Sequence, residues 1–301
     1  MSEKLCDGRV VVITGAGNGL GRAHALAFAA EGAKVVVNDL GSGRDGDGAS
    51  GGPAQQVADE IVAAGGAAVA NTDDISSWDG AGRLVRQAVE EFGGIDVLVN
   101  NAGILRDRMA VSMTERDWDS VVAVHLKGTF ATLHHAAAYW REQAKKGLPV
   151  DARVINTTSP SGLFGSVGQT NYGAAKAGIA SMTIIAAAEL ARYGVTVNAV
   201  APTAMTRLTE DIEMMRQAAE TTDLSPEAIS PLVVWLGSAA SKDVTGRVFG
   251  AMGNRITVLE GWVNGPAVDS AERWAPAALT DVVPGLVAKA APNADGLGNR
   301  T

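Results

Sequence analysis

The stretch Val10-Val11-Val12-Ile13-Thr14-Gly15-Ala16-Gly17-Asn18-Gly19-Leu20-Gly21 decides the fold, because a β-branched run passes directly into a glycine-rich turn and an Ala-rich segment. Glycines let the backbone turn tightly and approach a pyrophosphate, and the N-terminus of the next helix attracts the anion. A plain strand-to-helix turn is the alternative. The position on the first strand, with an acidic residue downstream, favours a nucleotide site formed by Gly15, Asn18, Gly19, Leu20 and Gly21.

Short β-branched runs alternate with longer Ala-rich segments along most of the chain, which is typical of a parallel sheet wrapped by helices. Strands that are apolar along their whole length are expected to be buried on both faces. We therefore predict an α/β fold, a Rossmann-type doubly wound parallel sheet of about seven strands with helices on both faces. The predicted strands are 9–14, 34–38, 67–72, 97–100, 153–157, 196–200 and 247–251, and the predicted helices are 21–31, 55–64, 79–92, 115–146, 172–192 and 226–236.

The chain of 301 residues suits one large or two small domains, and we assign residues 1–262 to a single dinucleotide-binding and catalytic domain. A Gly/Ser/Asp-rich insertion at 41–52 predicts a mobile loop. Residues 203–224 are the expected substrate lid, whose apolar side chains either cover the substrate or pack on the core. Prolines punctuate residues 263–301, which predicts a tail packing on the body or a partner subunit, with short helices at 270–273 and 277–283. The apolar lid residues are Met205, Leu208, Ile212, Met214 and Met215.

Composition and charge narrow the function classes. A net charge of −8 argues against general affinity for nucleic acid or a membrane surface, since both favour a basic footprint. The single Cys6 excludes an intrachain disulfide framework. We find no membrane-spanning run, no secretory signal and no metal-ligand spacing around the histidines. A cytoplasmic enzyme without a metal is the expectation.

Acidic and small residues follow the next strands. Asp39 ends the second strand, where a carboxylate accepts hydrogen bonds from ribose hydroxyls and repels a 2′-phosphate, so NAD is favoured over NADP. Arg44 in the insertion is the one residue that could reverse this preference. Asp74 and Ile75 follow the third strand and either meet the adenine or, for Asp74, cap the next helix. After the fourth strand, small residues would let the backbone lie near the cofactor at Asn101, Ala102 and Gly103.

Tyr172 and Lys176 are four residues apart, which places both side chains on one helix face, and Ser159 lies upstream at the end of a strand. Free tyrosine titrates near ~10. A positive charge ~4 Å away, at an effective dielectric of about 20, is worth roughly 4 kcal/mol. This predicts a phenol pKa of about 7, less the opposing effect of burial. An ordinary tyrosine and a surface lysine are the alternative for this motif alone.

Taken in order, the glycine-rich turn, Asp39, the Asn101 turn, Ser159 and Tyr172-x-x-x-Lys176 resemble the motifs of the short-chain dehydrogenase/reductase family over about residues 8–262. The resemblance implies Tyr172 as general acid/base, Ser159 as the group that holds the substrate oxygen, and Lys176 on the nicotinamide ribose. It also implies cofactor contacts from Pro202 and Thr206, hydride transfer with NAD, and a homodimer or homotetramer.

Longer stretches, such as Val36–Gly41 and Asn101–Arg108, resemble the (3R)-hydroxyacyl-CoA dehydrogenase domain of type 2 multifunctional β-oxidation enzymes, also called the type 4 17β-hydroxysteroid dehydrogenase group. This implies a 3-hydroxyacyl-CoA substrate. A dehydrogenase of a free steroid or another secondary alcohol is the alternative, and a non-catalytic nucleotide sensor is a second. His125 stands where most of the wider family has Asn; we expect its ring or carbonyl to support the proton path, or the ring to be a satisfied core histidine. Candidate contacts to CoA phosphates, which are otherwise solvated charges, are Arg106, Arg108, Lys127 and Arg207.

Overall fold

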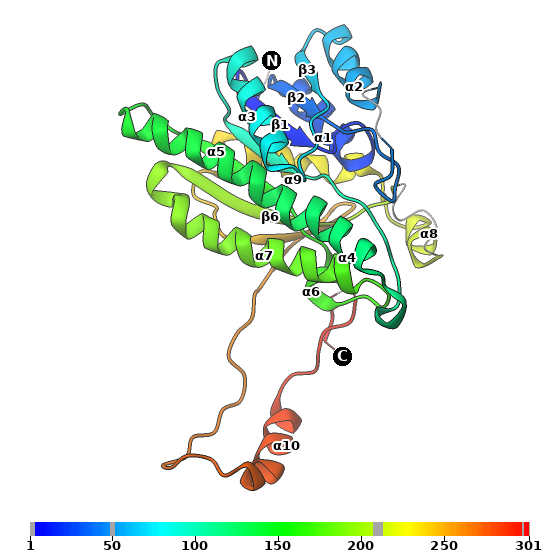
Figure 1. The fold of residues 1–301 in the computed structure, drawn as a ribbon, viewed down its shortest axis with the longest axis vertical. Helices are drawn as coiled ribbons and strands as arrows, with labels where there is room; N and C mark the ends of the chain where they lie inside the picture. Colours follow the sequence, from blue (N-terminus) through cyan, green and yellow to red (C-terminus); the bar gives the residue numbers. More distant parts are fainter. Residues whose placement is uncertain (1–3, 49–51, 207–212, 297, 301) are drawn as a thin grey trace.

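A computed structural model describes residues 4–48, 52–206, 213–296 and 298–300. Eight strands form one sheet in the order β3-β2-β1-β4-β5-β6-β7-β8 (Figure 1). The first seven run parallel and the eighth is antiparallel to β7. The strands are β1 Val10–Thr14, β2 Lys34–Asn38, β3 Ala67–Asn71, β4 Val97–Asn100, β5 Ala152–Thr157, β6 Val195–Thr203, β7 Val248–Met252 and β8 Arg255–Leu259.

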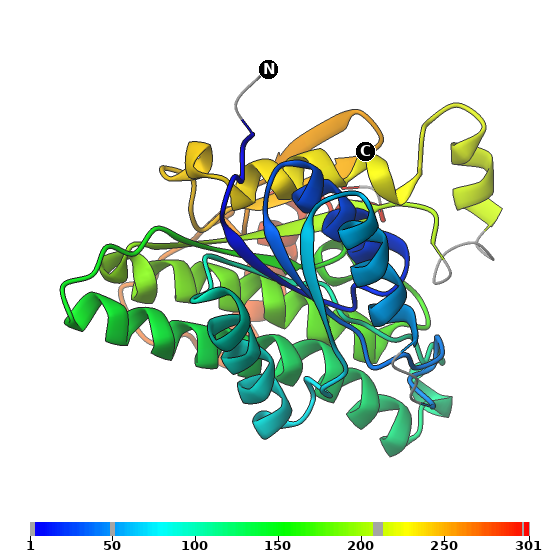
Figure 2. The same ribbon diagram turned by 90° about the horizontal axis from the view of Figure 1, so that it is seen from above.

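Helices cover both faces of the sheet, which confirms the doubly wound architecture (Figure 2). One core packs α1 and α9 with α2 on the first face, around side chains such as Phe28 and Leu236. The other core packs α3, α5 and α7 on the second face, around side chains such as Leu84 and Trp140. The helices are α1 Gly19–Ala30, α2 Gly52–Ala63, α3 Trp78–Phe92, α4 Glu115–Val122, α5 Gly128–Lys145, α6 Pro160–Phe164, α7 Thr170–Leu190, α8 Glu213–Ala219, α9 Ser230–Gly237 and α10 Leu279–Lys289.

The sheet has one strand more than the sequence predicted. β8 pairs with β7 through a two-residue turn at Gly253-Asn254, and Gly253 has a φ of +53°. A Gly-Asn pair between two apolar runs is a hairpin signal. It was overlooked because the β8 side chains are exposed or half-buried, unlike those of the central strands β1 and β4.

The predicted helix at 115–146 is divided. A π-helical turn, Ala123–Lys127, separates α4 from α5 and holds His125 at the centre of the interruption. Such turns occur frequently at functional sites. Two helices, α6 and α8, were not predicted, and the predicted helix at 270–273 is a bend.

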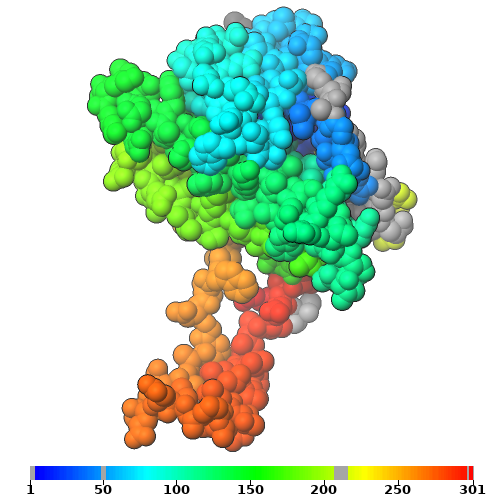
Figure 3. Space-filling model, in the orientation of Figure 1, coloured from blue at the N-terminus to red at the C-terminus, as the bar shows by residue number. Residues whose placement is uncertain are grey.

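The tail stands away from the body over most of its length (Figures 1 and 3). Trp262 is fully exposed and the side chains of α10 are exposed or half-buried. The chain returns to the body near its end, where Gly298 lies against the ring of Phe164. Among the described residues of the tail, packing against the body is seen at this end, and packing on a partner subunit stays a prediction.

By length and composition, the helical segment Thr170–Tyr193 could cross a membrane, which is an exception to the expectation drawn from the sequence. Its buried face packs on β6 and on the second core. We therefore interpret this segment as a core helix.

Candidate active site

A cavity of about 600 Å³ lies at the carboxyl ends of the strands. This is the edge at which doubly wound sheets bind their ligands. All but one of the predicted site residues line it, namely Gly15, Asn18, Gly19, Leu20, Asp39, Asp74, Ile75, Asn101, Ala102, Gly103, His125, Ser159, Tyr172, Lys176, Pro202 and Thr206. The exception is Gly21, which the structure does not place on the wall.

The glycine-rich turn joins β1 to α1 and supplies one side of the cavity. Gly15 has a φ of +64°, and a Cβ there would lie 2.7 Å from the Cα of Ala102, so only glycine fits. Gly21 is needed for a different reason than predicted: a Cβ there would collide with the carbonyl of Gly15 and the side chain of Asn101. Gly21 thus allows close helix–strand packing, while the N-terminus of α1 faces the cavity.

Asp39 points back to the glycine-rich turn. Its Oδ2 accepts a hydrogen bond of 2.8 Å from the backbone N–H of Gly17, and its Oδ1 accepts one of 2.7 Å from Gly41. These contacts fix a carboxylate on the cavity wall, at the end of β2.

Asp74 does not cap the following helix, because Ser77 is the N-cap of α3 and accepts from the N–H of Gly80. The Oδ1 of Asp74 instead accepts from the N–H of Ser76 at 2.8 Å. The helix-cap interpretation of Asp74 is therefore wrong, and the residue stays on the cavity wall beside Ile75.

Asn101 holds the fourth strand against the glycine-rich turn. Its Nδ2 donates to the carbonyls of Thr14 and Gly15, both at 3.1 Å. The hydroxyl of Thr14 accepts from the N–H groups of Asn101 and Ala102. These contacts hold the ends of β1 and β4 together beside the cavity, and Thr14 was not among the predicted site residues.

Ser159, Tyr172 and Lys176 meet at one end of the cavity. Ser159 follows β5 and is the N-cap of α6, while the other two lie on the first turns of α7. The Nζ of Lys176 lies 5.6 Å from the centroid of the Tyr172 ring and donates a hydrogen bond of 2.6 Å to the carbonyl of Thr157. The three side chains predicted to act together are thus brought together.

The pKa of the Tyr172 phenol lies well above the predicted value of about 7. Burial raises the pKa of Tyr172 to about 12, the hydrogen bond from Ser159 lowers it in part, and the charge of Asp107 raises it further. Burial also lowers the pKa of Lys176 to about 7. Burial therefore opposes the charged form of both groups. The sequence argument counted the charge and underestimated the burial.

His125 packs behind Tyr172, with the two rings at right angles and their centroids 5.1 Å apart. Its Nε2 lies 2.8 Å from the carbonyl oxygen of Ile104 and 3.1 Å from the N–H of the same residue, while the buried Nδ1 has no hydrogen-bond partner. Burial, the charge of Lys176 and, in the opposite sense, the bond to Ile104 set the pKa of His125 at about 3. The ring is therefore neutral near pH 7, and any part in a proton path is that of a neutral imidazole.

The insertion forms part of the cavity wall, which the sequence did not predict. Residues 42–47 line the cavity, as does Arg116 from α4. The insertion ends at Gly52 because α2 begins there. The charged residues of the insertion, Arg44, Asp45 and Asp47, were the signal that could have indicated its polar contacts.

In the lid, Arg207, Leu208 and Ile212 lie outside the described residues, as do the side chains of Met214 and Met215.

Comparisons with known proteins agree with this geometry. Residues 9–218 match the short chain dehydrogenase family. The chain is 46% identical over 262 residues to a hydroxyacyl-CoA dehydrogenase, ChsB1, of Mycobacterium tuberculosis, covering 84% of this chain and 80% of that protein. It is 48% identical to a peroxisomal hydratase-dehydrogenase-epimerase of Saccharomyces cerevisiae over 78% of this chain, but spans only 25% of the yeast enzyme.

A solved structure, a short chain dehydrogenase from Mycobacterium avium, is also similar. It is 58% identical, with a TM-score of 0.87 over 97% of this chain and 98% of the other. The agreement extends beyond the core to nearly the whole length. The chain is therefore an oxidoreductase of the short-chain dehydrogenase family.

Proposed function

We propose that the protein is an NAD-dependent 3-hydroxyacyl-CoA dehydrogenase. The observation that carries the proposal is the meeting of Ser159, Tyr172 and Lys176 at one end of a cavity whose other end is formed by the glycine-rich turn and Asp39. Relatives that are named hydroxyacyl-CoA dehydrogenase or peroxisomal multifunctional enzyme type 2, at 44–46% identity, support the substrate class.

The residues of the cavity fit a nicotinamide dinucleotide. The volume is in the range of small-molecule sites, the turn at Gly15 and the N-terminus of α1 suit a pyrophosphate, and Asp39 supplies an acceptor for ribose hydroxyls. The carboxylate at the end of β2 supports NAD over NADP, since it would repel a 2′-phosphate. When bound, the dinucleotide supplies the hydride acceptor.

The protein side of the reaction is proton handling at one oxygen. The Ser159 hydroxyl orients the substrate hydroxyl, and Tyr172 takes its proton as the carbinol carbon loses a hydride and becomes a ketone. The phenol can act as a base only if its pKa falls from about 12, which requires an added positive charge. Lys176, 5.6 Å from the phenol ring, supplies this charge when it is protonated.

Arg106 is a weaker candidate for CoA phosphates than the sequence indicated. Its Nη2 lies 3.0 Å from Asp47 and its Nη1 lies 3.8 Å from Asp117, so its charge is already compensated. Arg108 and Lys127 are exposed, and they remain the candidates of this group within the described chain.

Steady-state turnover tests the proposal. We expect turnover of a (3R)-3-hydroxyacyl-CoA with NAD to exceed that of the same hydroxy acid without CoA, and to exceed turnover with NADP. Equal rates with and without CoA would contradict the acyl-CoA assignment and favour a dehydrogenase of a free steroid or other alcohol. NADH binding, followed by its fluorescence, without turnover of any acyl-CoA would favour the nucleotide sensor.

A homodimer or homotetramer is part of the proposal. Phe130 on α5 and Ile184 and Ile185 on α7 are large apolar side chains left exposed by one chain, as is Trp262 at the start of the tail. Burial of such side chains between subunits supports self-association. Light scattering at several protein concentrations tests it, and a monomer throughout would contradict it. The cytoplasmic location stays a prediction.

A further inference from the structure

The insertion holds the loop that follows β4. The N–H of Leu105 donates to the carbonyl of Arg44 at 3.0 Å, and the Nη2 of Arg106 lies 3.0 Å from the Oδ1 of Asp47. Gly46 packs on Ile104 so closely that a Cβ there would lie 2.9 Å from the Cδ1 of Ile104. Backbone, charge and packing contacts thus join residues 44–47 to residues 104–106.

The same loop is fastened to the start of the helix that carries Tyr172. The N–H of Arg108 donates to the carbonyl of Gly168 at 2.8 Å, and the Nε2 of Gln169 donates to Asp107 at 2.8 Å. The Nδ2 of Asn171 donates to the carbonyl of Arg106 at 3.1 Å. Residues 104–108 therefore lie between the insertion and the catalytic end of the cavity, bound to both.

Asn171 is the junction of these contacts. It is completely buried, and its Nδ2 also donates to the carbonyl of Asp117 in α4 at 3.0 Å. Its Oδ1 accepts from the N–H of Tyr172 at 2.8 Å. One amide side chain thus uses both of its donor hydrogens on neighbouring elements and its acceptor on the residue that would carry out proton transfer.

We propose that Asn171 is a positioning residue that couples the dinucleotide end of the cavity to Tyr172. The path runs through Asp47 in the insertion and Arg106 in the loop after β4. The proposal rests on the proposed function, because it assumes that a dinucleotide occupies the side lined by residues 42–47. Contact of the dinucleotide with the insertion restricts Asp47, the ion pair restricts Arg106, and Asn171 transmits the restriction to the backbone of Tyr172.

Hydrogen–deuterium exchange of the full chain, with and without saturating NADH, tests the coupling without requiring a substrate. In the wild type, we expect NADH to slow exchange in residues 104–108 and 168–172 together, because backbone N–H groups in both segments belong to the network. In Asp47→Asn, which changes an exposed carboxylate, we expect NADH to bind but the slowing at 168–172 to fall at least threefold. Equal slowing at 168–172 in this variant and the wild type would overturn the proposal.

Kinetics give a second measure. Asn171→Asp keeps an acceptor for the N–H of Tyr172 but loses both donors, and we expect kcat to fall about tenfold while KM for NAD stays within twofold. Asp47→Asn should lower kcat about threefold alone and add little to Asn171→Asp, because both act on one path. Fully additive effects would contradict the path.

Glu115→Gln is the matched control, since Glu115 is an exposed carboxylate on the same helix as Asp117. It should leave both the exchange pattern and kcat unchanged, and a loss equal to that of Asp47→Asn would show a general charge effect instead. Absence of acyl-CoA turnover in the wild type, with the exchange coupling intact, would reject the proposed function and keep the coupling.

Discussion

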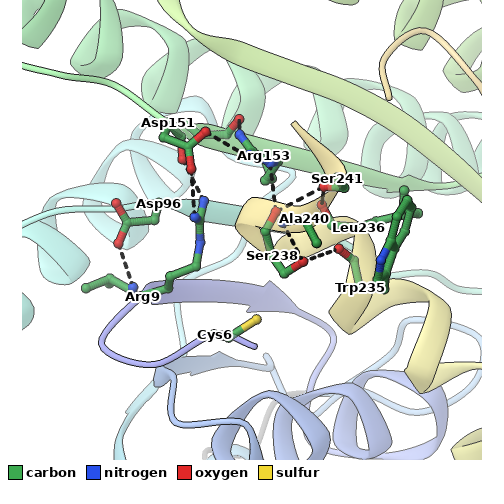
Figure 4. Close-up of polar contacts among 12 residues, drawn as sticks. Cys6, Arg9, Asp96, Asp151, Arg153, Trp235, Leu236, Ser238, Ala240 and Ser241 are labelled. Atoms are coloured by element: carbon green, nitrogen blue, oxygen red, sulfur yellow. Dashed lines mark hydrogen bonds and ion pairs between the residues drawn. The ribbon is translucent and has the colours of Figure 1, made fainter. Parts of the chain in front are cut away.

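The two ends of the sheet each bury a basic side chain, but within the described residues only the one at the amino end is paired with a carboxylate. At the amino end of β5, Arg153 is 1% exposed, its Nε donates to the carbonyl of Ser238 at 3.0 Å, and its Nη2 lies 2.6 Å from Asp151 (Figure 4). That last contact is ionic, since Nη2 makes no well-directed hydrogen bond. At the carboxyl end, Lys176 is 3% exposed and makes no ion pair within the described residues.

This difference makes Arg153 a structural charge and Lys176 a group that can titrate. Burial lowers the pKa of Arg153, but the ion pair with Asp151 opposes this, and a guanidinium stays protonated under all ordinary conditions. Burial without a carboxylate lowers the pKa of Lys176 to about 7. A buried charge without a partner costs stability, and such costs are concentrated at functional sites. We therefore expect changes at the carboxyl end to affect activity and changes at the amino end to affect stability.

Tyr172→Phe should give the largest effect. Loss of the phenol hydroxyl removes the proton acceptor, so turnover should fall at least about a hundredfold, or roughly 3 kcal/mol in activation free energy. NADH binding and the melting temperature should change little, because the ring that packs against His125 remains. Steady-state kinetics, fluorescence titration and thermal unfolding check the three quantities. Retained turnover would rule out the proposed role of Tyr172.

Lys176→Met should produce a pH-dependent gain in stability of the cofactor-free protein. Below about pH 7 the lysine is protonated in both states, and the wild type bears the full cost of burying the ammonium. Between pH 7 and the unfolded pKa near ~10.4, the folded state loses the proton and the unfolded state keeps it, so the cost declines by about 1.4 kcal/mol per pH unit. The advantage of the variant should thus shrink by roughly 2–3 kcal/mol from pH 7 to pH 9.

Chemical denaturation at pH 7, 8 and 9 measures this advantage for both proteins. Lys242→Met, at an exposed position, is the control and should give a difference from the wild type that is nearly independent of pH. A constant difference for Lys176→Met would mean that Lys176 does not titrate in this range, and the comparison of the two ends would fail.

The sequence predicted most of the fold and the members of the site, but not their electrostatic state. Periodic apolar runs located the seven parallel strands, most of which are buried although β3 is half-buried, whereas β8 escaped because its residues are largely exposed. The Tyr172–Lys176 spacing predicted a shared helix face correctly, since four residues make about one turn. Their pKa values depend on burial among residues that are distant in sequence, such as Thr157 beside Lys176 and His125 behind Tyr172. For the same reason, no local pattern indicated that Asn171 contacts Arg106 and Asp117.

Asp151→Asn tests the amino end and should have the smallest effect. Burial raises the pKa of Asp151, but hydrogen bonds and charges from Arg9 and Arg153 outweigh it, so its pKa lies below the usual value. Loss of a partner leaves Arg153 buried with an uncompensated charge. Because the side chain of Asp151 is 54% exposed, water screens part of this loss, and we expect about 1–2 kcal/mol of destabilisation at pH 7.

The pH dependence of that loss distinguishes an ion pair from simple packing. A carboxyl whose pKa is lower in the folded state contributes stability above its unfolded pKa, near ~3.9, and loses it as pH falls through the folded value. The difference between Asp151→Asn and the wild type should therefore be constant above about pH 5 and decline in more acidic solution, while kcat/KM of the folded protein stays within twofold. Asp243→Asn, an exposed control, should show neither change. If Asp151→Asn lowered kcat/KM tenfold at unchanged stability, the amino end would belong to the catalytic machinery, and the division between the two ends of the sheet would be wrong.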